Sequence, residues 1–268
     1  MSRSLIQPRI LWSISAALLL AGCGGLTRNM QPVDVSDQNG RLFVGGLSLD
    51  HHREVSLFGE WEGEQVPMVL MSPTAAVDLV GCPGTTFELV VDLYTEIEGD
   101  GGVELTDGVL TAWSEKDGAV LINGIRGRVP EGLSLDVRSA TGDVWLASFM
   151  NGQNLRVEAG TGAVAVSGCD VNQIAVDTAT GEVRMSDCTA ETVSMDLGVG
   201  SLAASNCVLA DFRGDSGTGN FYFHGSRLGR ASFVSAVGDV HLTDTMVSDL
   251  DSALGTGSVE VTATARKR

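Results

Sequence analysis

Three cysteines in the second half of the chain, Cys169, Cys188 and Cys207, follow one another at intervals of nineteen residues. Thiols at equal spacing can form disulfides, bind zinc or pack as free thiols. Equivalent side chains in stacked strands point the same way, which is poor geometry for a disulfide, and three sulfurs in a straight line cannot surround a tetrahedral ion. We therefore expect a column of buried free thiols, with one disulfide between neighbours and a metal site as alternatives.

Four acids recur at the same interval. They are Glu158, Asp177, Asp196 and Asp215. Stacked carboxylates either point into solvent or bind a hard cation such as calcium through oxygen. The calcium-binding nonapeptide repeat of toxin-type β-rolls is absent from the sequence, so we expect solvated side chains.

A further set of equivalent positions carries large polar and aromatic residues, namely Trp145, Arg184, Tyr222 and His241. Aromatic side chains on an outward strand face can stack on sugar rings or anchor a protein partner. We treat these four as a candidate ligand-facing surface, with an ordinary solvated surface as the alternative. No nucleophile, base and orienting group come together, and the sequence contains no phosphate loop or dinucleotide fingerprint. No cofactor or metal is expected.

These residues are positioned by a repeat. Glycine recurs at 142, 162, 181, 200, 219, 238 and 257. Apolar residues stand seven and five positions before each glycine and two and four after it, alternating with polar residues, which predicts two short strands per copy. The position two before the glycine is always Ala or Gly, so we expect a sharp corner there, with the glycine at positive φ. A fixed short period indicates stacked repeats whose apolar faces form one core.

The predicted fold is therefore all-β: a parallel β-solenoid of about seven nineteen-residue rungs, a rung being one copy of the repeat, preceded by an irregular β N-terminal capping region. Leu110 to Ile122 is interpreted as a degenerate rung centred on Gly118, followed by a loop at 123–132. His51 and His52 are expected in an exposed turn. The predicted organisation is 1–22 signal peptide, 23–40 flexible tether, 41–108 capping region, 109–264 solenoid and 265–268 basic C-terminal end, whose charges are expected to block end-to-end pairing.

The start of the chain resembles a bacterial lipoprotein signal. Arg3 and Arg9 precede an apolar stretch at 10–20 that is too short for a transmembrane helix, and Leu-Ala-Gly-Cys at 20–23 resembles the lipobox. That resemblance implies cleavage before Cys23 and a lipid on its sulfur. Gly24 replaces the Asp of the inner-membrane retention signal, which favours the outer membrane.

The chain is strongly acidic. Its formal net charge is −17, and removal of Arg3 and Arg9 with the signal would make it −19. This charge argues against nucleic acid as a partner and against electrostatic binding to anionic lipid. The only membrane contact expected is the lipid on Cys23.

Rungs such as LDVRSATGDVWL, LRVEAGTGAVAV and FVSAVGDVHL resemble those of the bacterial putative-adhesin family, a β-solenoid domain of unknown function. The similarity covers roughly residues 110 to 264. It implies an envelope or surface role and supplies no catalytic residues.

The sequence favours a non-enzymatic, lipid-anchored envelope protein that acts as an adhesin-like binding or structural module with a glycan or envelope-protein ligand. One alternative is a β-helical polysaccharide lyase or hydrolase, whose catalytic acids would lie on an outer face. Another is a polymer-forming scaffold, which would need both ends of the rod open. The nearly uniform rungs lack the long loops that normally wall a substrate groove.

Overall fold

The computed structural model describes residues 35–38, 41–44, 47–61 and 66–262, and every regular element in these ranges is a β-strand. The predicted signal peptide, Cys23, most of the tether and the basic end lie outside the described residues. The last part of the predicted tether forms strand β1 (Val35–Gln38), which pairs with β2 (Arg41–Val44). No helix suited to crossing a bilayer occurs in the described part of the chain.

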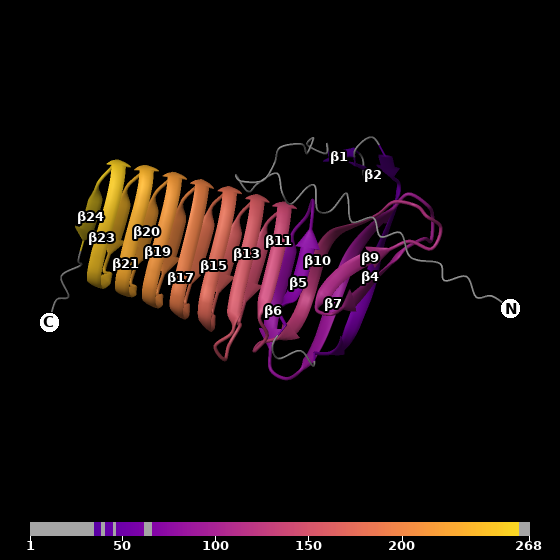
Figure 1. Ribbon diagram of the computed structural model, residues 1–268, viewed down its shortest axis with the longest axis horizontal. Coiled ribbons are helices and arrows are strands. Elements are labelled where there is room, and N and C mark those ends of the chain that lie inside the picture. Colours follow the sequence, from indigo (N-terminus) through magenta and orange to yellow (C-terminus); the bar gives the residue numbers. More distant parts are fainter. Residues whose placement is uncertain (1–34, 39–40, 45–46, 62–65, 263–268) are drawn as a thin grey trace.

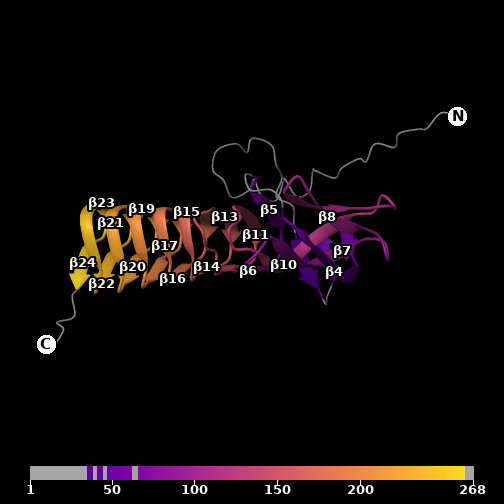
Figure 2. The ribbon, with the colours of Figure 1, turned by 90° about the horizontal axis from the view of Figure 1, so that it is seen from below.

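The seven predicted rungs are present and stack into a rod with two layers (Figures 1 and 2). Each rung consists of one strand in a 10-stranded sheet and one shorter strand in an 11-stranded sheet, and equivalent strands pair in parallel. The strands of the 10-stranded sheet are β11 (Leu135–Thr141), β13 (Asn154–Thr161), β15 (Asp170–Thr180), β17 (Thr189–Val199), β19 (Val208–Thr218), β21 (Arg227–Val237) and β23 (Met246–Thr256). The short strands are β12 (Val144–Ala147), β14 (Val164–Ser167), β16 (Val183–Ser186), β18 (Leu202–Ser205), β20 (Phe221–His224), β22 (Val240–Thr243) and β24 (Val259–Thr262).

The first corner of each rung lies at the repeated glycine and the residue after it, two residues later than predicted. The strand continues through Thr180, for example, and the next strand starts at Val183. Gly181 has φ +156°, and a Cβ placed on it would lie 1.8 Å from the carbonyl oxygen of Gly162 in the neighbouring rung. Only glycine fits there because both the backbone conformation and the close stacking exclude a side chain.

The second corner lies six residues after the glycine, where left-handed residues form a column that we did not predict. The φ angles in this column lie between 49° and 61°, and its members are Ser148, Gly168, Asp187, Asn206, Gly225 and Asp244. Gly, Asn and Asp are the residues that tolerate this conformation best. The next residue turns inward, and in three rungs it is a cysteine of the thiol column.

The core between the two sheets is made by the predicted inward positions. Val183 and Leu202 are fully buried in successive rungs, and so are Ile174 and Val193 in the other sheet. Where the repeat becomes aromatic, ring centroids pack 5.0 to 6.4 Å apart among Phe212, Phe221, Phe223 and Phe233. The alternation is therefore confirmed.

The capping region is joined to the rod in an order that the sequence did not indicate. Its strands are β3 (Leu47–Leu49), β4 (His51–Glu60), β5 (Met68–Ser72), β6 (Val77–Cys82), β7 (Thr86–Thr95), β8 (Gly102–Thr106), β9 (Val109–Trp113) and β10 (Val120–Pro130). β5 and β6 pair in parallel with β11 and β12 and form an additional rung. On its other side lie β9 and β10, although they come later in the chain. The rung β5–β6 is thus inserted between two segments that follow it in sequence.

The predicted rung centred on Gly118 is wrong. Ile125 and Val144 both pair with Val77, so Asn123 rather than Gly118 is equivalent to Gly142. The predicted loop at 123–132 is wrong for the same reason, because most of it belongs to β10. Beyond β10, the 11-stranded sheet ends with β7 and β4, which pair antiparallel.

Candidate functional site

The four predicted ligand-facing residues lie in one column on the outer face of the 11-stranded sheet. Trp145 and Tyr222 are each 41% exposed, although both belong to strands whose alternate residues are buried. The strand register gives the column its full order: Asp78, Trp145, Ala165, Arg184, Ala203, Tyr222, His241, Glu260. We call these eight residues the outer column.

Tyr222 and His241 form a stacked pair. Their ring centroids are 4.9 Å apart and the ring planes differ by 7°. Asn220 donates a hydrogen bond from Nδ2 to the Tyr222 hydroxyl at 2.7 Å, and Nδ1 of His241 lies 3.2 Å from Oε2 of Glu260. Because the rings stack along the direction in which the strands are stacked, the other face of Tyr222 is turned toward the strand that carries Ala203.

Arg184 is fixed along its own strand. Its Nε and Nη2 donate to the two carboxylate oxygens of Glu182 at 3.0 and 2.7 Å. This hydrogen bonding raises the pKa of Arg184 and lowers the pKa of Glu182. A two-bond contact restricts the plane of the guanidinium, and a planar guanidinium can stack on a flat group.

Large and small side chains alternate along this part of the outer column. Ala165 separates Trp145 from Arg184, and Ala203 separates Arg184 from Tyr222. Large residues two strands apart are roughly 10 Å from each other. A flat ring between two such groups needs roughly 7 to 8 Å, since carbon contacts are about 3.5 to 4 Å on each side. The alternation therefore leaves two gaps that are wide enough for a single ring.

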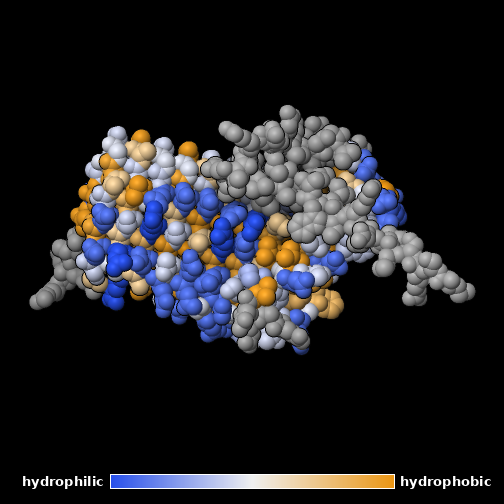
Figure 3. Space-filling model, viewed as in Figure 1, coloured by the Kyte–Doolittle hydropathy of each residue, from blue (hydrophilic) through white to orange (hydrophobic). Residues whose placement is uncertain are grey.

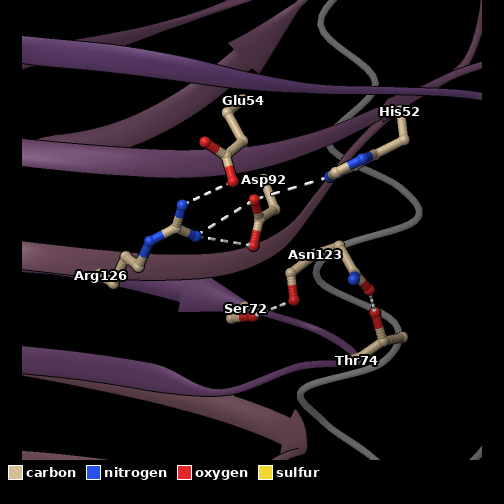
Figure 4. A network of polar contacts seen from close by, with 7 residues as sticks. All are labelled: His52, Glu54, Ser72, Thr74, Asp92, Asn123 and Arg126. Carbon is tan, nitrogen blue, oxygen red and sulfur yellow. Dashed lines mark hydrogen bonds and ion pairs between the residues drawn. The ribbon is translucent and has the colours of Figure 1, made fainter.

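The capping region extends the same face, because Arg126 and Trp145 both pair in register with Asp78. Arg126 makes ion pairs with Glu54 at 2.6 Å and with Asp92 at 3.3 Å (Figure 4). The hydrogen bond to Glu54 raises the pKa of Arg126. The predicted turn at His51 and His52 is wrong because both residues belong to β4, whereas the predicted exposure holds for His52. His52 lies 3.6 Å from Asp92 and against Tyr94.

The same view shows how the inserted rung is fixed to β10. Ser72 donates from Oγ to the backbone oxygen of Asn123 at 3.0 Å, and Thr74 contacts the Asn123 side chain (Figure 4). These contacts fix the inserted rung to β10, and the strand register places Arg126 and Trp145 on one face, since both pair with Asp78. Sequence reasoning missed this part of the site because it did not pair residues 68–82 with the rod.

The cysteine column is buried, and its thiols form hydrogen bonds at the second corner of their rungs. None of the four described cysteines forms a disulfide. Sγ of Cys169, Cys188 and Cys207 each donates to the carbonyl oxygen two residues earlier at 3.2 to 3.3 Å. Ser226 and Thr245, at the equivalent positions of later rungs, make the same contact through their hydroxyls. The cysteines are thus interchangeable with hydroxyl residues as hydrogen-bond donors, which explains their spacing without redox or metal chemistry.

Interaction between neighbouring thiols changes their acidity along the column. The interaction of Cys169 with Cys188 lowers the pKa of Cys169 and raises the pKa of Cys188 to about 11. The pKa of Cys207 is also raised, first by its hydrogen bond to Cys188 and then by burial. Thiols with raised pKa values are poor nucleophiles at neutral pH because the thiolate is scarce.

The four acids lie in one register on the outer face of the 10-stranded sheet, where hydrophilic residues are abundant (Figure 3). Glu158 contacts Arg156, and Asp215 accepts from Nε of Arg213 at 2.8 Å. The pKa of Asp177 is raised by burial and by the charge of Asp196. Within the described ranges, no three metal-binding side chains gather closely enough to hold an ion.

Residues 170–267 match the family model described as Toastrack DUF4097. This stretch includes the five C-terminal rungs and confirms the predicted resemblance there. No curated protein matches the chain significantly.

Among solved structures, a putative adhesin from Bacteroides fragilis is 14% identical with a TM-score of 0.49, over 78% of this chain and 97% of its own. A putative adhesin from Parabacteroides merdae is 13% identical with a TM-score of 0.40, over 79% and 96%. A putative cell adhesion protein from Clostridium sporogenes is 9% identical with a TM-score of 0.31, over 80% and 100%.

Proposed function

We propose that this protein is a non-enzymatic rod of the bacterial envelope that binds a glycan through the outer column. The observation that carries the proposal is the alternation of large and small side chains, with the uncovered face of Tyr222 turned toward the gap over Ala203. A pyranose ring in this gap would stack on Tyr222 on one side and on the Arg184 guanidinium on the other. Its hydroxyls would meet Glu182 and Asn220, which both flank the gap on the side of the first corner.

The geometry of the gap also sets the direction of the ligand. The ring planes of Tyr222 and His241 face along the rod, so a bound sugar ring would lie parallel to the strands. The neighbouring sugars of a chain would then continue across the sheet rather than along the rod. This arrangement suits chain ends, branches, or a chain that crosses the rod, and it favours short glycan determinants over long uninterrupted tracts.

The binding test uses the mature protein in detergent on a glycan array. Tyr222→Ala and Arg184→Ala should each weaken binding to the selected glycans about tenfold, which corresponds to about 1.4 kcal/mol. Val234→Ala is the matched control, because Val234 is also 41% exposed but lies on the opposite sheet. Binding that is equal in wild type and all three variants would show that the outer column is not the site.

We assign membrane attachment to the lipid on Cys23 and the location to the outer membrane. A Cys23→Ser variant should remain unacylated and leave the detergent phase in a phase-partitioning experiment. Continued partition into detergent by that variant would contradict lipid anchoring.

The catalytic alternative is tested on the acid column. We expect no turnover of acidic or neutral polysaccharides, with or without calcium. Pairing of Glu158 and Asp215 with arginines favours a structural role for these carboxylates. Release of unsaturated oligosaccharides that is lost in Asp196→Ala would establish an enzyme instead.

A further inference from the structure

The two gaps of the outer column differ in the charges that flank them. We call the gap between Trp145 and Arg184 the Ala165 gap, after the residue at its floor. Its side at the first corner is flanked by Asp143 and Glu182, each two residues before a wall residue. These two acids occupy equivalent positions two rungs apart, so they are roughly 10 Å from each other. A ligand in the Ala165 gap would therefore meet two carboxylates on this side.

A hydrogen bond directs Asp143 toward the Ala165 gap. Its Oδ1 accepts from the backbone N–H of Ala163 in the next rung at 2.7 Å. The carboxylate therefore leans from the rung of Trp145 toward the rung of Ala165. Within the described ranges, Asp143 has no cationic partner and its Oδ2 accepts no hydrogen bond. Both the charge and the second oxygen are thus available to a ligand in the gap.

The gap over Ala203 is less acidic. The equivalent flanking residues there are Glu182 and Asn220, so an amide replaces one of the two carboxylates. Glu182 binds the Arg184 guanidinium through both of its oxygens, at 3.0 and 2.7 Å, and the two charges compensate each other. Of the two gaps, the Ala165 gap is therefore the one with an uncompensated carboxylate, that of Asp143.

Trp145 also suits a ligand with a positive charge. The face of an indole attracts an ammonium group more strongly than the other aromatic side chains do, and it packs against the apolar face of a flat ring. A ligand with both a flat body and an ammonium group would use Trp145 and Asp143 together. A carboxylated or sulfated sugar would be repelled by Asp143, which selects against acidic glycans.

We propose that the Ala165 gap is a subsite for an amino sugar, that is, a pyranose with a protonated, unacetylated amino group. The ring would lie between Trp145 and Arg184, with its ammonium group toward Oδ2 of Asp143. Acetylation of the nitrogen would remove the charge and add bulk on the side of the two acids, so the acetylated sugar should bind more weakly. This inference rests on the proposed glycan binding by the outer column and names the class of sugar.

The test compares short β-1,4-linked oligomers of glucosamine, N-acetylglucosamine and glucose, which share a backbone and differ in the group at carbon 2 of each ring. Affinities are measured by titration calorimetry in a slightly acidic buffer, with the protein prepared as for the glycan array. Wild type should bind the glucosamine oligomer about tenfold more tightly than the other two. This preference should shrink as the salt concentration rises, because it is electrostatic.

Asp143→Asn should abolish the preference and leave the affinity for the glucose oligomer unchanged. The amide can keep the hydrogen bond to the next rung, as Asn220 does, whose Oδ1 accepts from the Asp239 N–H at 2.8 Å. Asp239→Asn is the matched control, because Asp239 accepts from the Ser258 N–H at 2.7 Å in the same way but flanks neither gap. This control should keep the preference. Equal melting temperatures of the two variants will show that both fold.

Three outcomes would overturn the inference. They are a wild type that does not prefer the glucosamine oligomer, equal losses in the two asparagine variants, and a lysine-rich peptide that binds as tightly and depends equally on Asp143. The last outcome would mean that the gap recognises charge without a sugar ring. The proposed function is judged separately, since glycans from the array whose binding falls in Tyr222→Ala would still support the outer column.

Discussion

Gly214 is the residue at which the repeat most clearly departs from its own pattern, and it gives a sharp test of the core. The equivalent inward residues of the four preceding rungs are Val137, Val157, Val176 and Met195. A Cβ placed on Gly214 would lie 2.6 Å from Cε1 of Phe221 and 3.0 Å from Cε1 of Phe212. The two rings occupy the space that valine or methionine fills in the other rungs.

Restoring the repeat residue with Gly214→Val should therefore destabilise the protein. Overpacking of this kind costs about 1 to 3 kcal/mol. For a domain of roughly 200 residues, that loss corresponds to a fall in melting temperature of roughly 2 to 12 °C. The backbone of Gly214 is not in the left-handed region, so the loss would come from the side-chain clash alone.

Phe221→Val should rescue the first change, because valine is the residue of three earlier rungs at that position. Alone it would leave a cavity and cost about 2 to 4 kcal/mol. In the double variant the valine introduced by Gly214→Val enters this cavity, so the double variant should be more stable than the sum of the single effects by at least about 1 kcal/mol. Met195→Val is the control, with an expected cost below about 1.5 kcal/mol.

The assay is chemical denaturation of the four variants and wild type, followed by a double-mutant cycle. A neutral or stabilising Gly214→Val would refute the packing argument. Strict additivity in the cycle would show that the introduced valine and the Phe221 ring do not compete for the same space.

Three other predictions concern burial and protonation. Val183→Asp should cost several kcal/mol in thermal melts because it buries an unpaired charge, whereas Glu182→Lys should change stability by only about 0.5 kcal/mol; equal effects would put the strand alternation in doubt. Burial acts to raise the pKa of Asp100, but hydrogen bonds from Ser114 and from backbone N–H groups lower it to about 2. The ionised Asp100 carboxylate therefore contributes fully to the free energy of unfolding above about pH 4, and this contribution is lost as the pH falls toward about 2. Asp100→Asn should make the free energy of unfolding less dependent on pH between about 4 and 2. An unchanged pH dependence would contradict this. At about pH 8 a thiol reagent should not modify Cys188 or Cys207 in the folded protein, since their raised pKa values and burial both disfavour reaction; rapid labelling before unfolding would contradict it.

The rod could be predicted because its nineteen-residue period is marked by positions at which few residue types fit. Glycine is required where Gly181 and its equivalents meet the preceding carbonyl, and alternation then fixes which residues point inward. The second corner could also have been predicted from Asp187, Asn206 and Gly225, since Asp, Asn and Gly are the residue types that tolerate a left-handed backbone best. The pattern is weaker in the first rung, where Ser148 holds the equivalent position.

The cap could not be predicted in the same way. The inserted rung has Ala75 where the repeat has glycine, and its neighbours are set by pairing with segments about 40 to 70 residues later in the chain. The local sequence pattern does not indicate that the β5–β6 rung is placed between two segments that follow it in the chain. For the same reason, the continuity of Arg126, Asp78 and Trp145 on one face became visible only from the strand register.

The inserted rung also determines how the molecule would respond to being pulled. The segment 131–134 connects β10 to β11 and passes across the β5–β6 rung, where the Glu131 amide donates to the Cys82 carbonyl at 2.9 Å. Separation of β6 from β12 would also have to lengthen this short connection, so covalent bonds resist the force there as well as hydrogen bonds. Under tension along the rod, the cap and the first rungs should stay together as one unit, and the first strands to separate should be those of the rungs nearer the β23–β24 end.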